Sequence, residues 1–575
     1  MKSATWIWTW ITFSLVALGW FGVAEAQYYR HARPLPPRGL KLSAAAPAAK
    51  SSTASPWQPV ISPPPFPPNE CNGFGAFPGG GNPLLLTDGS VIIQDAGCPD
   101  WVRLTPDSSG SYANGTWTVI ASLPAGYSPL YHSSAVLPDG RVIIMGGEYN
   151  YYGGLYFVPI WTAEGAIYDP RTNVWTSVAP PPFFEVQPTT LPPPFSITIY
   201  AQTIGDAQSI VLPNGVYMQA DCCTKQQALL DAKTLTWIPT GTGKYDINDE
   251  EGWNLLPNGE VLTVDAYVPV GFPYIPNGTN SELYNYRTGT WHSAGSTIVQ
   301  LWDSGLTCGE LSAAPPTPTF EVGPAVLRAD GTVFATGSNT CAGESGSTAI
   351  YDSYSGVWRP GPVFPEIDGV TDINVADGPA SWEPNDKVLV QASPEYGSPP
   401  SFFFEWDGKH LNQVPGPPNA PFEGSYVGDM LLLPTGQILF TDDISTDIEL
   451  YTPTVTAEDR QFQQTIAPAI IRAPLEVTPG GSYQIEGFLL NGMTQGAAYG
   501  DDVQAATNYP LVRITNLRTS HVFYSRTHDH SSMAVASYLP VSTHFDVPAD
   551  QETGPSLLEV VANGVASRPW FVYVR

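Results

Sequence analysis

Acidic residues recur at one fixed place in a repeated hairpin of this 575-residue chain. The place lies nine residues before the glycine of the hairpin turn, or before the residue that replaces this glycine, and ten residues before it where the turn is longer. The acidic residues at this place are Asp206, Glu250, Glu321 and Asp377, and Glu251 is next to one of them. Carboxylates crowded at one place repel one another unless a partner neutralises them. A hard cation such as Ca²⁺, or a hydroxyl-rich ligand such as a carbohydrate, would do so. The alternative is that these acids only cap a solvated channel of an acidic protein.

Histidines and a tyrosine form a second set of candidates. Tyr131 and His132 begin a strand at the same counted place in another hairpin. His528 and His530 are two residues apart, so on a strand they share a face and could ligate one metal together. The alternative for this pair is a surface loop in which each histidine hydrogen-bonds locally.

The hairpin occurs seven times, and this repeat predicts the fold class. Its copies begin at Leu84, Ala135, Ile210, Asn254, Ala325, Ser381 and Leu431. Between them a second turn is followed by tryptophan, as in IYDPRTNVW, LLDAKTLTW, LYNYRTGTW and IYDSYSGVW. Four strands in a period of roughly 40–50 residues are typical of a propeller blade. The sequence therefore predicts an all-β protein built on a seven-bladed β-propeller.

Two features set the limits of the propeller. The seventh unit lacks its tryptophan strand, and SPWQPVI around Trp57 supplies a matching one, so we expect residues 57–61 to close the ring. After residue 466 the hairpin pattern ends, and alternating strands predict an immunoglobulin-like β-sandwich over 467–575. The propeller is thus expected over 54–466.

The N-terminus and the charge restrict where the protein acts and what it meets. An apolar run and an Ala-Glu-Ala site predict a signal peptide over 1–26, and a Pro/Ala/Ser-rich linker follows over 27–53. An uncleaved membrane anchor is the alternative. We therefore expect a secreted or extracytoplasmic protein with no membrane contact after cleavage. A net charge of −29 excludes nucleic acid as a partner and favours cationic or neutral ligands.

An even number of cysteines in an exported chain suggests disulfides. The six are Cys71, Cys98, Cys222, Cys223, Cys308 and Cys341. Local pairing would join the first to the second and the fifth to the sixth. The adjacent third and fourth either bond to each other or pair elsewhere.

With this layout the chain resembles the galactose oxidase and glyoxal oxidase family, which joins a kelch-type propeller to an immunoglobulin-like domain. The resemblance implies an axial copper ion held by two tyrosines and two histidines, with one tyrosine cross-linked to a cysteine. Tyr131 and Tyr426 match the tyrosines, and RTHDHSSM places His528 at the histidine that a C-terminal loop brings into the ring. Val427 stands at the place of the other histidine and Gly80 at that of the cysteine, so the copper-radical site is incomplete.

Three functions remain open from these residues. The first is an exported binding protein for carbohydrate that uses the acidic mouth of the propeller, with Ca²⁺ as a possible ion. The second is copper-dependent oxidation of alcohols or aldehydes at a modified site built from Tyr131, His132, Tyr426, His528 and His530. The third is a lyase or hydrolase that uses the axial carboxylates as acid and base.

Overall fold

The computed structural model describes residues 55–67, 79–150, 161–190, 198–267, 278–303, 319–338, 345–394 and 397–575. The predicted signal peptide and linker lie outside these residues, as do Cys71, Cys308 and Cys341. In the part of the chain that is described, no helix is long and apolar enough to cross a membrane.

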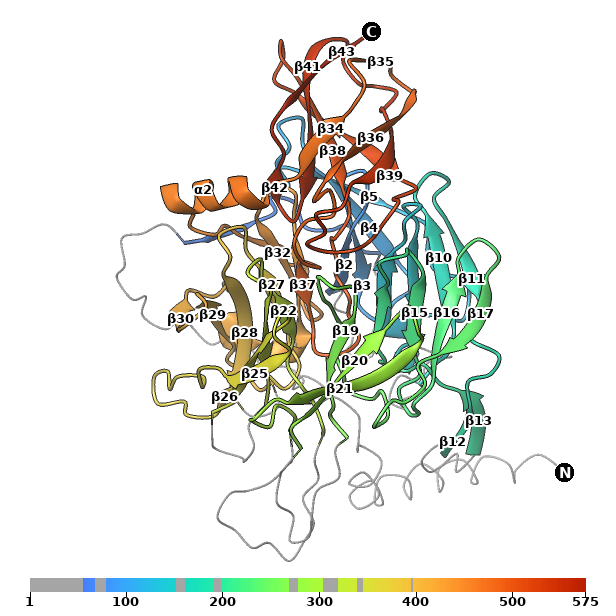
Figure 1. The fold of residues 1–575 in the computed structure, drawn as a ribbon, viewed down its shortest axis with the longest axis vertical. Coiled ribbons are helices and arrows are strands. Elements are labelled where there is room, and N and C mark those ends of the chain that lie inside the picture. The colour runs from blue at the N-terminus through green and yellow to red at the C-terminus, as the bar shows by residue number, and fades with distance from the viewer. Residues whose placement is uncertain are drawn as a thin grey trace, which may run out of the picture.

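Seven antiparallel sheets form the blades of a β-propeller, which confirms the predicted fold class (Figure 1). The first three blades are β2 (Gly80–Leu85), β3 (Val91–Asp95), β4 (Trp101–Thr105) and β5 (Thr116–Val119); β7 (Ser133–Val136), β8 (Val142–Met145), β10 (Gly165–Asp169) and β11 (Val174–Val178); and β14 (Ser209–Val211), β15 (Tyr217–Ala220), β16 (Gln227–Asp231) and β17 (Thr236–Thr240). Short pairs outside the blades are β6 (Pro129–Leu130) with β9 (Tyr149–Asn150), and β12 (Val186–Thr190) with β13 (Thr198–Gln202).

The next three blades continue the same order along the chain. They are β18 (Asn254–Leu255), β19 (Val261–Val264), β20 (Asn280–Asn285) and β21 (Thr290–Ser296); β22 (Ala325–Leu327), β23 (Thr332–Thr336), β24 (Thr348–Asp352) and β25 (Val357–Pro360); and β27 (Ala380–Trp382), β28 (Val388–Pro394), β29 (Phe402–Trp406) and β30 (Leu411–Val414), with β26 (Ile373–Asn374) beside β28. Two 3₁₀ turns, η3 (Ala420–Phe422) and η4 (Ser425–Val427), lead into the last blade.

The seventh blade is completed by the N-terminal strand, as the sequence predicts. Its strands are β31 (Gly428–Leu432), β32 (Ile438–Asp442), β33 (Glu449–Tyr451) and β1 (Trp57–Pro59). In β1, Trp57 pairs with Tyr451 of β33 and buries its ring against Phe403 and Phe440. β31 also contacts β2 of the first blade, so the ring is closed.

The recurring tryptophans explain how one blade is fixed to the next. Each sits on the outer strand of its blade, and its indole N–H donates a hydrogen bond to the preceding blade. The pairs are Trp117 with Ser62, Trp175 with Ala121, Trp237 with Ala179, Trp291 with Gln227 and Trp358 with Ser281. The repeated Trp is therefore an inter-blade contact; it is buried in Trp175, Trp291 and Trp358 and partly exposed in Trp117 and Trp237.

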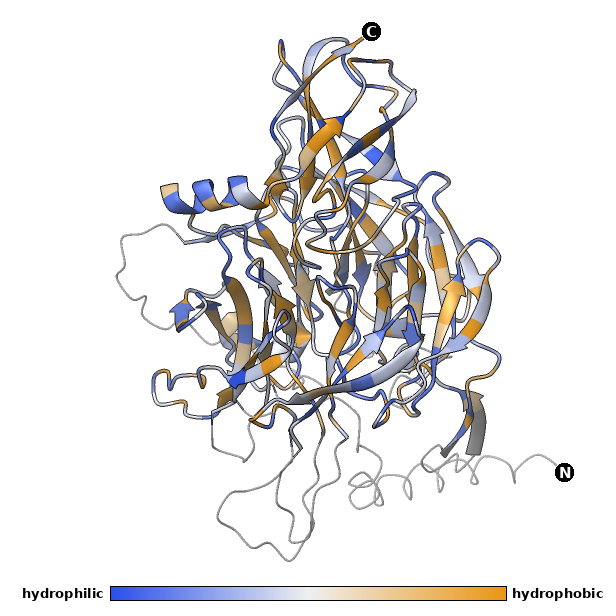
Figure 2. Ribbon diagram, in the orientation of Figure 1, coloured by the Kyte–Doolittle hydropathy of each residue, from blue (hydrophilic) through white to orange (hydrophobic). Residues whose placement is uncertain are grey.

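A capped helix and a further set of strands follow the propeller. The helix α2 (Ala457–Ile466) begins with a capping box between Thr456 and Asp459 and buries only Ile466. Most of this helix is hydrophilic (Figure 2). The strands are β34 (Ala469–Arg472), β35 (Glu476–Val477), β36 (Ser482–Phe488), β38 (Leu511–Asn516), β39 (Val522–His528), β40 (Val541–Asp546), β41 (Gly554–Ala562), β42 (Val565–Ala566) and β43 (Trp570–Val574).

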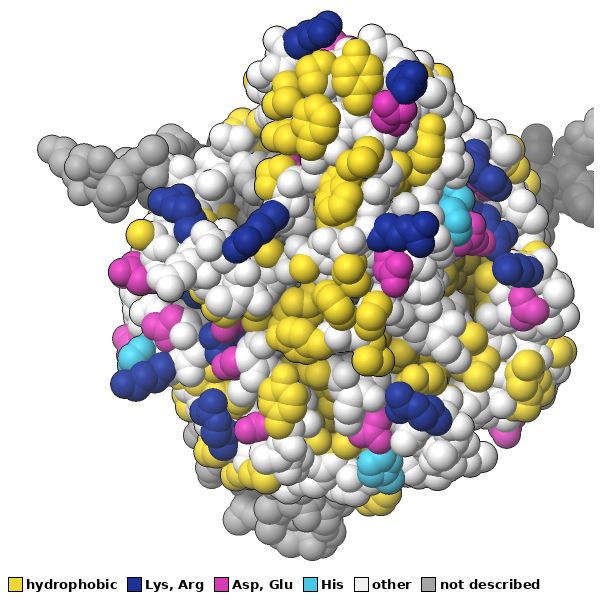
Figure 3. All heavy atoms as spheres, turned by 45° about the horizontal axis from the view of Figure 1, so that its top comes forward, with side chains coloured by type: hydrophobic (Ala, Val, Ile, Leu, Met, Phe, Trp, Pro, Cys, Tyr) yellow, Lys and Arg dark blue, Asp and Glu magenta, His cyan; other side chains and the backbone are white. Residues whose placement is uncertain are grey.

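These C-terminal strands have a hydrophobic cluster of their own that includes Ile514, Phe545 and Leu558. Strand β39 pairs with β38 through its first residues and with β40 through its last three, so it joins two halves of the set. The immunoglobulin-like sandwich stays a prediction. Figure 3 shows apolar side chains on the surface of this part of the molecule. The exposed apolar residues of the C-terminal region include Leu475, Phe571 and Tyr573.

One C-terminal segment, residues 489–510 between β36 and β38, runs into the channel of the propeller. Its short strand β37 (Ala497–Ala498) pairs with β27 of the sixth blade, so it lies within the ring (Figure 1). Its Gln504 carbonyl accepts a hydrogen bond from Ser134 of the second blade. Its Tyr499 hydroxyl donates to the Tyr426 carbonyl at 2.5 Å. We call this stretch the channel segment.

Candidate functional site

Five buried carboxylates meet on the propeller axis. Carboxylate oxygens of Asp206, Glu250 and Asp501 lie within 4.8 Å of one another, and so do those of Glu250, Glu321 and Asp377. Glu250 belongs to both sets, so the five residues form one group, which we call the axial cluster. No member is more than 5% exposed. The four acids that the repeat placed at equivalent positions are therefore brought together, but inside the protein rather than around an open mouth.

The backbone ahead of each inner strand places these side chains. Glu250 and Asp377 have positive φ angles of 57° and 68°, and Tyr131 has the same feature, with φ 53°, at the equivalent place in the second blade. Asp206 and Glu321 instead follow a residue with positive φ. Such left-handed backbone is unfavourable for side chains other than glycine and persists where the surroundings require it.

Asp501 is the member of the axial cluster that the sequence did not predict. It comes from the channel segment, some 120–300 residues away from the other four, so no hairpin count could reach it. Its Oδ1 accepts a hydrogen bond from the Asp502 N–H at 2.7 Å. The only signal was the Asp-Asp pair in the run AYGDDV.

Burial and mutual repulsion act together on Glu250. Burial raises the pKa of Glu250 well above its ordinary value, and the charges of Glu321, Asp501 and Asp206 raise it further. Its Oε2 atom is buried and has no hydrogen-bond partner among the described residues. An oxygen-only donor set with a buried, unsatisfied carboxylate oxygen is suited to a hard cation.

The raised pKa of Glu250 gives a pH dependence that can be measured without any metal. Above the ordinary value of 4.5 the folded protein holds a proton that the unfolded chain has lost. The free energy of unfolding therefore falls as pH rises. In a chelator, Glu250→Gln should match the wild type near pH 4 and become progressively more stable than it towards pH 8, as measured by urea unfolding. A difference that stays constant with pH would contradict this assignment.

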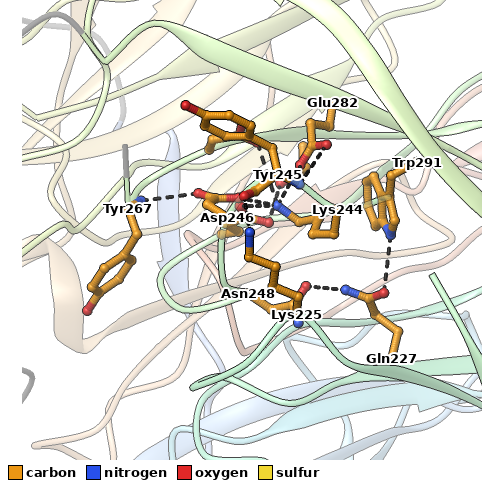
Figure 4. Close-up of polar contacts among 12 residues, drawn as sticks. Lys225, Gln227, Lys244, Tyr245, Asp246, Asn248, Tyr267, Glu282 and Trp291 are labelled. Carbon is orange, nitrogen blue, oxygen red and sulfur yellow. Dashed lines mark hydrogen bonds and ion pairs between the residues drawn. The ribbon is translucent and has the colours of Figure 1, made fainter. Parts of the chain in front are cut away.

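Glu251 belongs to a second buried group around Lys244 rather than to the axial cluster. Figure 4 shows Lys244 of this group together with Asp246 and Glu282. The Lys244 ammonium lies 2.7 Å from Glu251, 2.9 Å from Glu282 and 3.6 Å from Asp265, and it also contacts Asp246. Burial works against the charge of Lys244, but the four carboxylates outweigh it and raise its pKa. The prediction that Glu251 joins the axial carboxylates was wrong, because its carboxylate pairs with Lys244.

The two C-terminal histidines also lie away from the axis. His528, on β39, faces Asp529 and Asp546 with its two ring nitrogens, at 2.8 and 3.1 Å. The His530 amide donates to the Pro138 carbonyl in a hairpin turn of the second blade. Among the described residues, no group of three or more potential metal ligands includes a histidine. The expectation that His528 reaches into the ring is corrected: the segment that does so is 489–510.

His132 is held as a neutral side chain in the wall of the channel. Gln94 donates through its amide nitrogen to the carbonyls of Cys98 and Pro129, so its amide oxygen accepts from His132 Nε2 at 2.8 Å. The other ring nitrogen faces the Asn82 amide at 3.3 Å. Burial lowers the pKa of His132 to about 4. Both ring nitrogens are thus used within the protein.

The copper ion implied by the resemblance does not fit these residues. Tyr131, Tyr426 and Tyr499 line one small cavity together with His132 and Asp429. The imidazole in that cavity is committed to hydrogen bonds, and the described part of the chain brings no second imidazole to it. Copper sites of this kind depend on imidazole ligands. Tyr131 and Tyr426 line the same cavity, as the resemblance implies, but this cavity does not offer the two imidazole ligands that the copper site needs.

Comparison with known proteins finds distant structural similarity. No family model matches the chain, and no curated protein matches it. A fungal alcohol oxidase of the AA5 family, in complex with copper, is similar at 15% identity and a TM-score of 0.39, covering 86% of this chain and 85% of that one. A GH74 xyloglucanase from Xanthomonas campestris is similar at 10% identity and a TM-score of 0.42, covering 89% and 81%. At these values the similarity says nothing of activity.

Proposed function

We propose that this protein is a binding protein that holds a hard divalent cation, Ca²⁺, on the propeller axis. The observation that carries the proposal is Glu250, buried and shared between two sets of carboxylates whose oxygens lie within 4.8 Å. Ca²⁺ takes six to eight oxygen ligands in flexible geometry, roughly 2.3–2.6 Å from the ion. Four blades and the channel segment supply carboxylates, so one ion would tie the C-terminal strands to the propeller.

The distribution of buried charge supports a cation. The described residues bury 22 aspartate and glutamate side chains but only two lysine or arginine side chains, Lys244 and Arg328. Lys244 serves the group around Glu251, and Arg328 bonds to Asp330 and Asp386 in the turns. The axial cluster gathers five of these buried acidic side chains in one place. Carboxylates crowded and buried in this way repel one another, and a bound cation would relieve that repulsion.

Calcium titration tests this proposal. Isothermal titration should show one site per chain, and a hundredfold excess over Kd should raise the free energy of unfolding by about 2.7 kcal/mol. Glu250→Gln should raise Kd by roughly tenfold or more, because one charged ligand is lost. Glu383→Gln is the matched control, since Glu383 is also buried with a pKa raised to about 8 but lies outside the axial cluster. Equal affinity in Glu250→Gln and the wild type would contradict the proposal.

We propose a carbohydrate as a second ligand, bound beside the axial cluster. We also propose that the protein is exported. Tyr267 and Phe320 stack at 4.0 Å, and Trp302 stacks on Phe320 at 5.5 Å. Phe320 directly precedes Glu321, so this aromatic group adjoins the axial cluster. Trp302 is buried, whereas Tyr267 and Phe320 are partly exposed. Partly exposed aromatic rings beside an oxygen-ligated ion suit a sugar, which offers both apolar faces and hydroxyl groups. Sugars should raise the melting temperature of the protein when calcium is present and leave it unchanged in a chelator.

Acid–base catalysis by the axial carboxylates is the weaker alternative. Glu250 has a raised pKa beside other carboxylates, which is the pairing that a lyase or hydrolase needs. All five carboxylates are buried, however, and a single ion fits such a place better than a polymer does. Binding is therefore the function that the geometry favours.

A further inference from the structure

The adjacent cysteines form a vicinal disulfide next to the axial cluster. Cys222 and Cys223 are bonded to each other in the turn between β15 and β16. Cys222 is fully buried, whereas Cys223 is partly exposed. A sulfur of Cys222 lies within 4.8 Å of carboxylate oxygens of Asp206 and Asp249. The disulfide therefore has one sulfur towards the surface and the other towards a proposed calcium ligand.

The turn that contains the disulfide is attached to both segments that carry Asp206 and Glu250. On one side, the Cys222 amide donates to the Ile204 carbonyl at 3.2 Å, two residues before Asp206. On the other, the Asn248 side chain donates to the carbonyls of Asp221 and Thr224 at 3.1 and 2.7 Å. Asn248 itself stands two residues before Glu250. Any shift of this turn is passed to two members of the axial cluster.

Space around Cys222 is closed on the side of Gly205. A Cβ built on Gly205 would lie 2.9 Å from the Cys222 sulfur, and Gly205 also has a positive φ of 63°. Bonded sulfurs lie about 2.05 Å apart, whereas non-bonded heavy atoms rest roughly 3.5–4.0 Å apart. If the bond is broken, the two sulfurs must move apart. A displaced Cys222 sulfur, with Gly205 close on one side, would change its contacts with Asp206 and Asp249.

We propose that the Cys222–Cys223 disulfide controls the axial cation site, with tight binding in the oxidised state and weak binding in the reduced state. This inference rests on the calcium proposal above. In the step itself, a dithiol attacks the partly exposed Cys223 sulfur and the Cys222–Cys223 bond breaks. Two electrons and two protons pass to the cysteines, which become thiols, and the dithiol becomes a cyclic disulfide. By linkage, calcium must then oppose the reduction to the same extent.

Calcium titration of the oxidised protein and of the protein reduced with a dithiol tests this control. Alkylation and mass analysis would verify that Cys222 and Cys223 are reduced. We expect reduction to raise the Kd for Ca²⁺ at least tenfold in the wild type. Equal Kd values in the two states would overturn the redox control and leave the calcium proposal standing. An absence of binding in both states would overturn both.

A paired variant separates this disulfide from the others, because Cys98 is also disulfide-bonded. Cys222→Ser/Cys223→Ser should bind calcium weakly with and without the dithiol. If the dithiol still weakens binding by this variant, another disulfide is responsible and the inference is wrong. Should the variant fail to fold, the reduction midpoint of Cys222–Cys223 in the wild type serves instead. Calcium should make that bond harder to reduce, and an unchanged midpoint would overturn the inference.

Discussion

Replacing Lys244 by methionine is expected to lower the free energy of unfolding by about 3–5 kcal/mol, since buried charges would lose their partner. Lys244 is 1% exposed at its side chain and faces Asp246, Glu251, Asp265 and Glu282. Methionine keeps most of the volume but removes the ammonium, so four carboxyl groups would repel one another in the interior.

The pH dependence of that loss follows from the same carboxylates. Burial raises the pKa of Asp265 to about 8 even with Lys244 present, and the other carboxylates of the group add to the effect. Without Lys244, the group must take up further protons to fold, so the variant should lose more stability at pH 8 than at pH 5. Urea unfolding at both pH values measures this.

Lys225→Met is the matched control for Lys244→Met. Lys225 belongs to the same network, where its ammonium donates to the Tyr245 carbonyl, but its side chain is exposed (Figure 4). We expect this control to change the free energy of unfolding by less than about 1 kcal/mol. A similar loss of unfolding free energy in the two variants would contradict the conclusion that the buried ion pairs of Lys244 stabilise the protein.

Replacing Trp57 by alanine is expected to cost about 3–5 kcal/mol, as for other buried tryptophans. Trp57 is 6% exposed, packs on Phe403 and Phe440, and donates through its indole N–H to the Pro415 carbonyl at 2.5 Å. It is the anchor of β1, so its loss would weaken the closure of the ring and expose the edge of β33.

Gln58→Ala provides the comparison for Trp57→Ala on the same strand. Gln58 is exposed and pairs with Leu450 only through the backbone ladder. Thermal unfolding of the two variants should give a large loss for the tryptophan and a change within about 0.5 kcal/mol for the glutamine. If the Trp57→Ala protein has the same melting temperature as the wild type, β1 does not close the propeller.

The propeller and most of the axial cluster could be predicted from the sequence because each blade repeats one local pattern. A fixed count from the hairpin turn located Asp206, Glu250, Glu321 and Asp377 without any knowledge of contacts. The same repeat also indicated that β1 would complete the last blade. The repeat shows where the inner strand of each blade begins. Because the blades close into a ring, residues at equivalent positions in different blades lie close together around the axis.

Contacts between distant segments could not be predicted in this way. Asp501 reaches the axis through a pairing of β37 with β27, and nothing in the local sequence specifies that pairing. His528 was expected there because a Thr-His motif matched a family pattern, but β39 and β40 hold it against Asp546. The prediction for Glu251 was wrong for a different reason. Its carboxylate forms an ion pair with Lys244 and so belongs to a separate group.

The metal content of the purified protein, after dialysis against calcium and removal of free ions, is the most direct test of the account. Elemental analysis should find one calcium per chain in the wild type and less than that in Asp206→Asn/Glu250→Gln. Stoichiometric copper, or calcium retained equally by the double variant, would contradict the axial cation site.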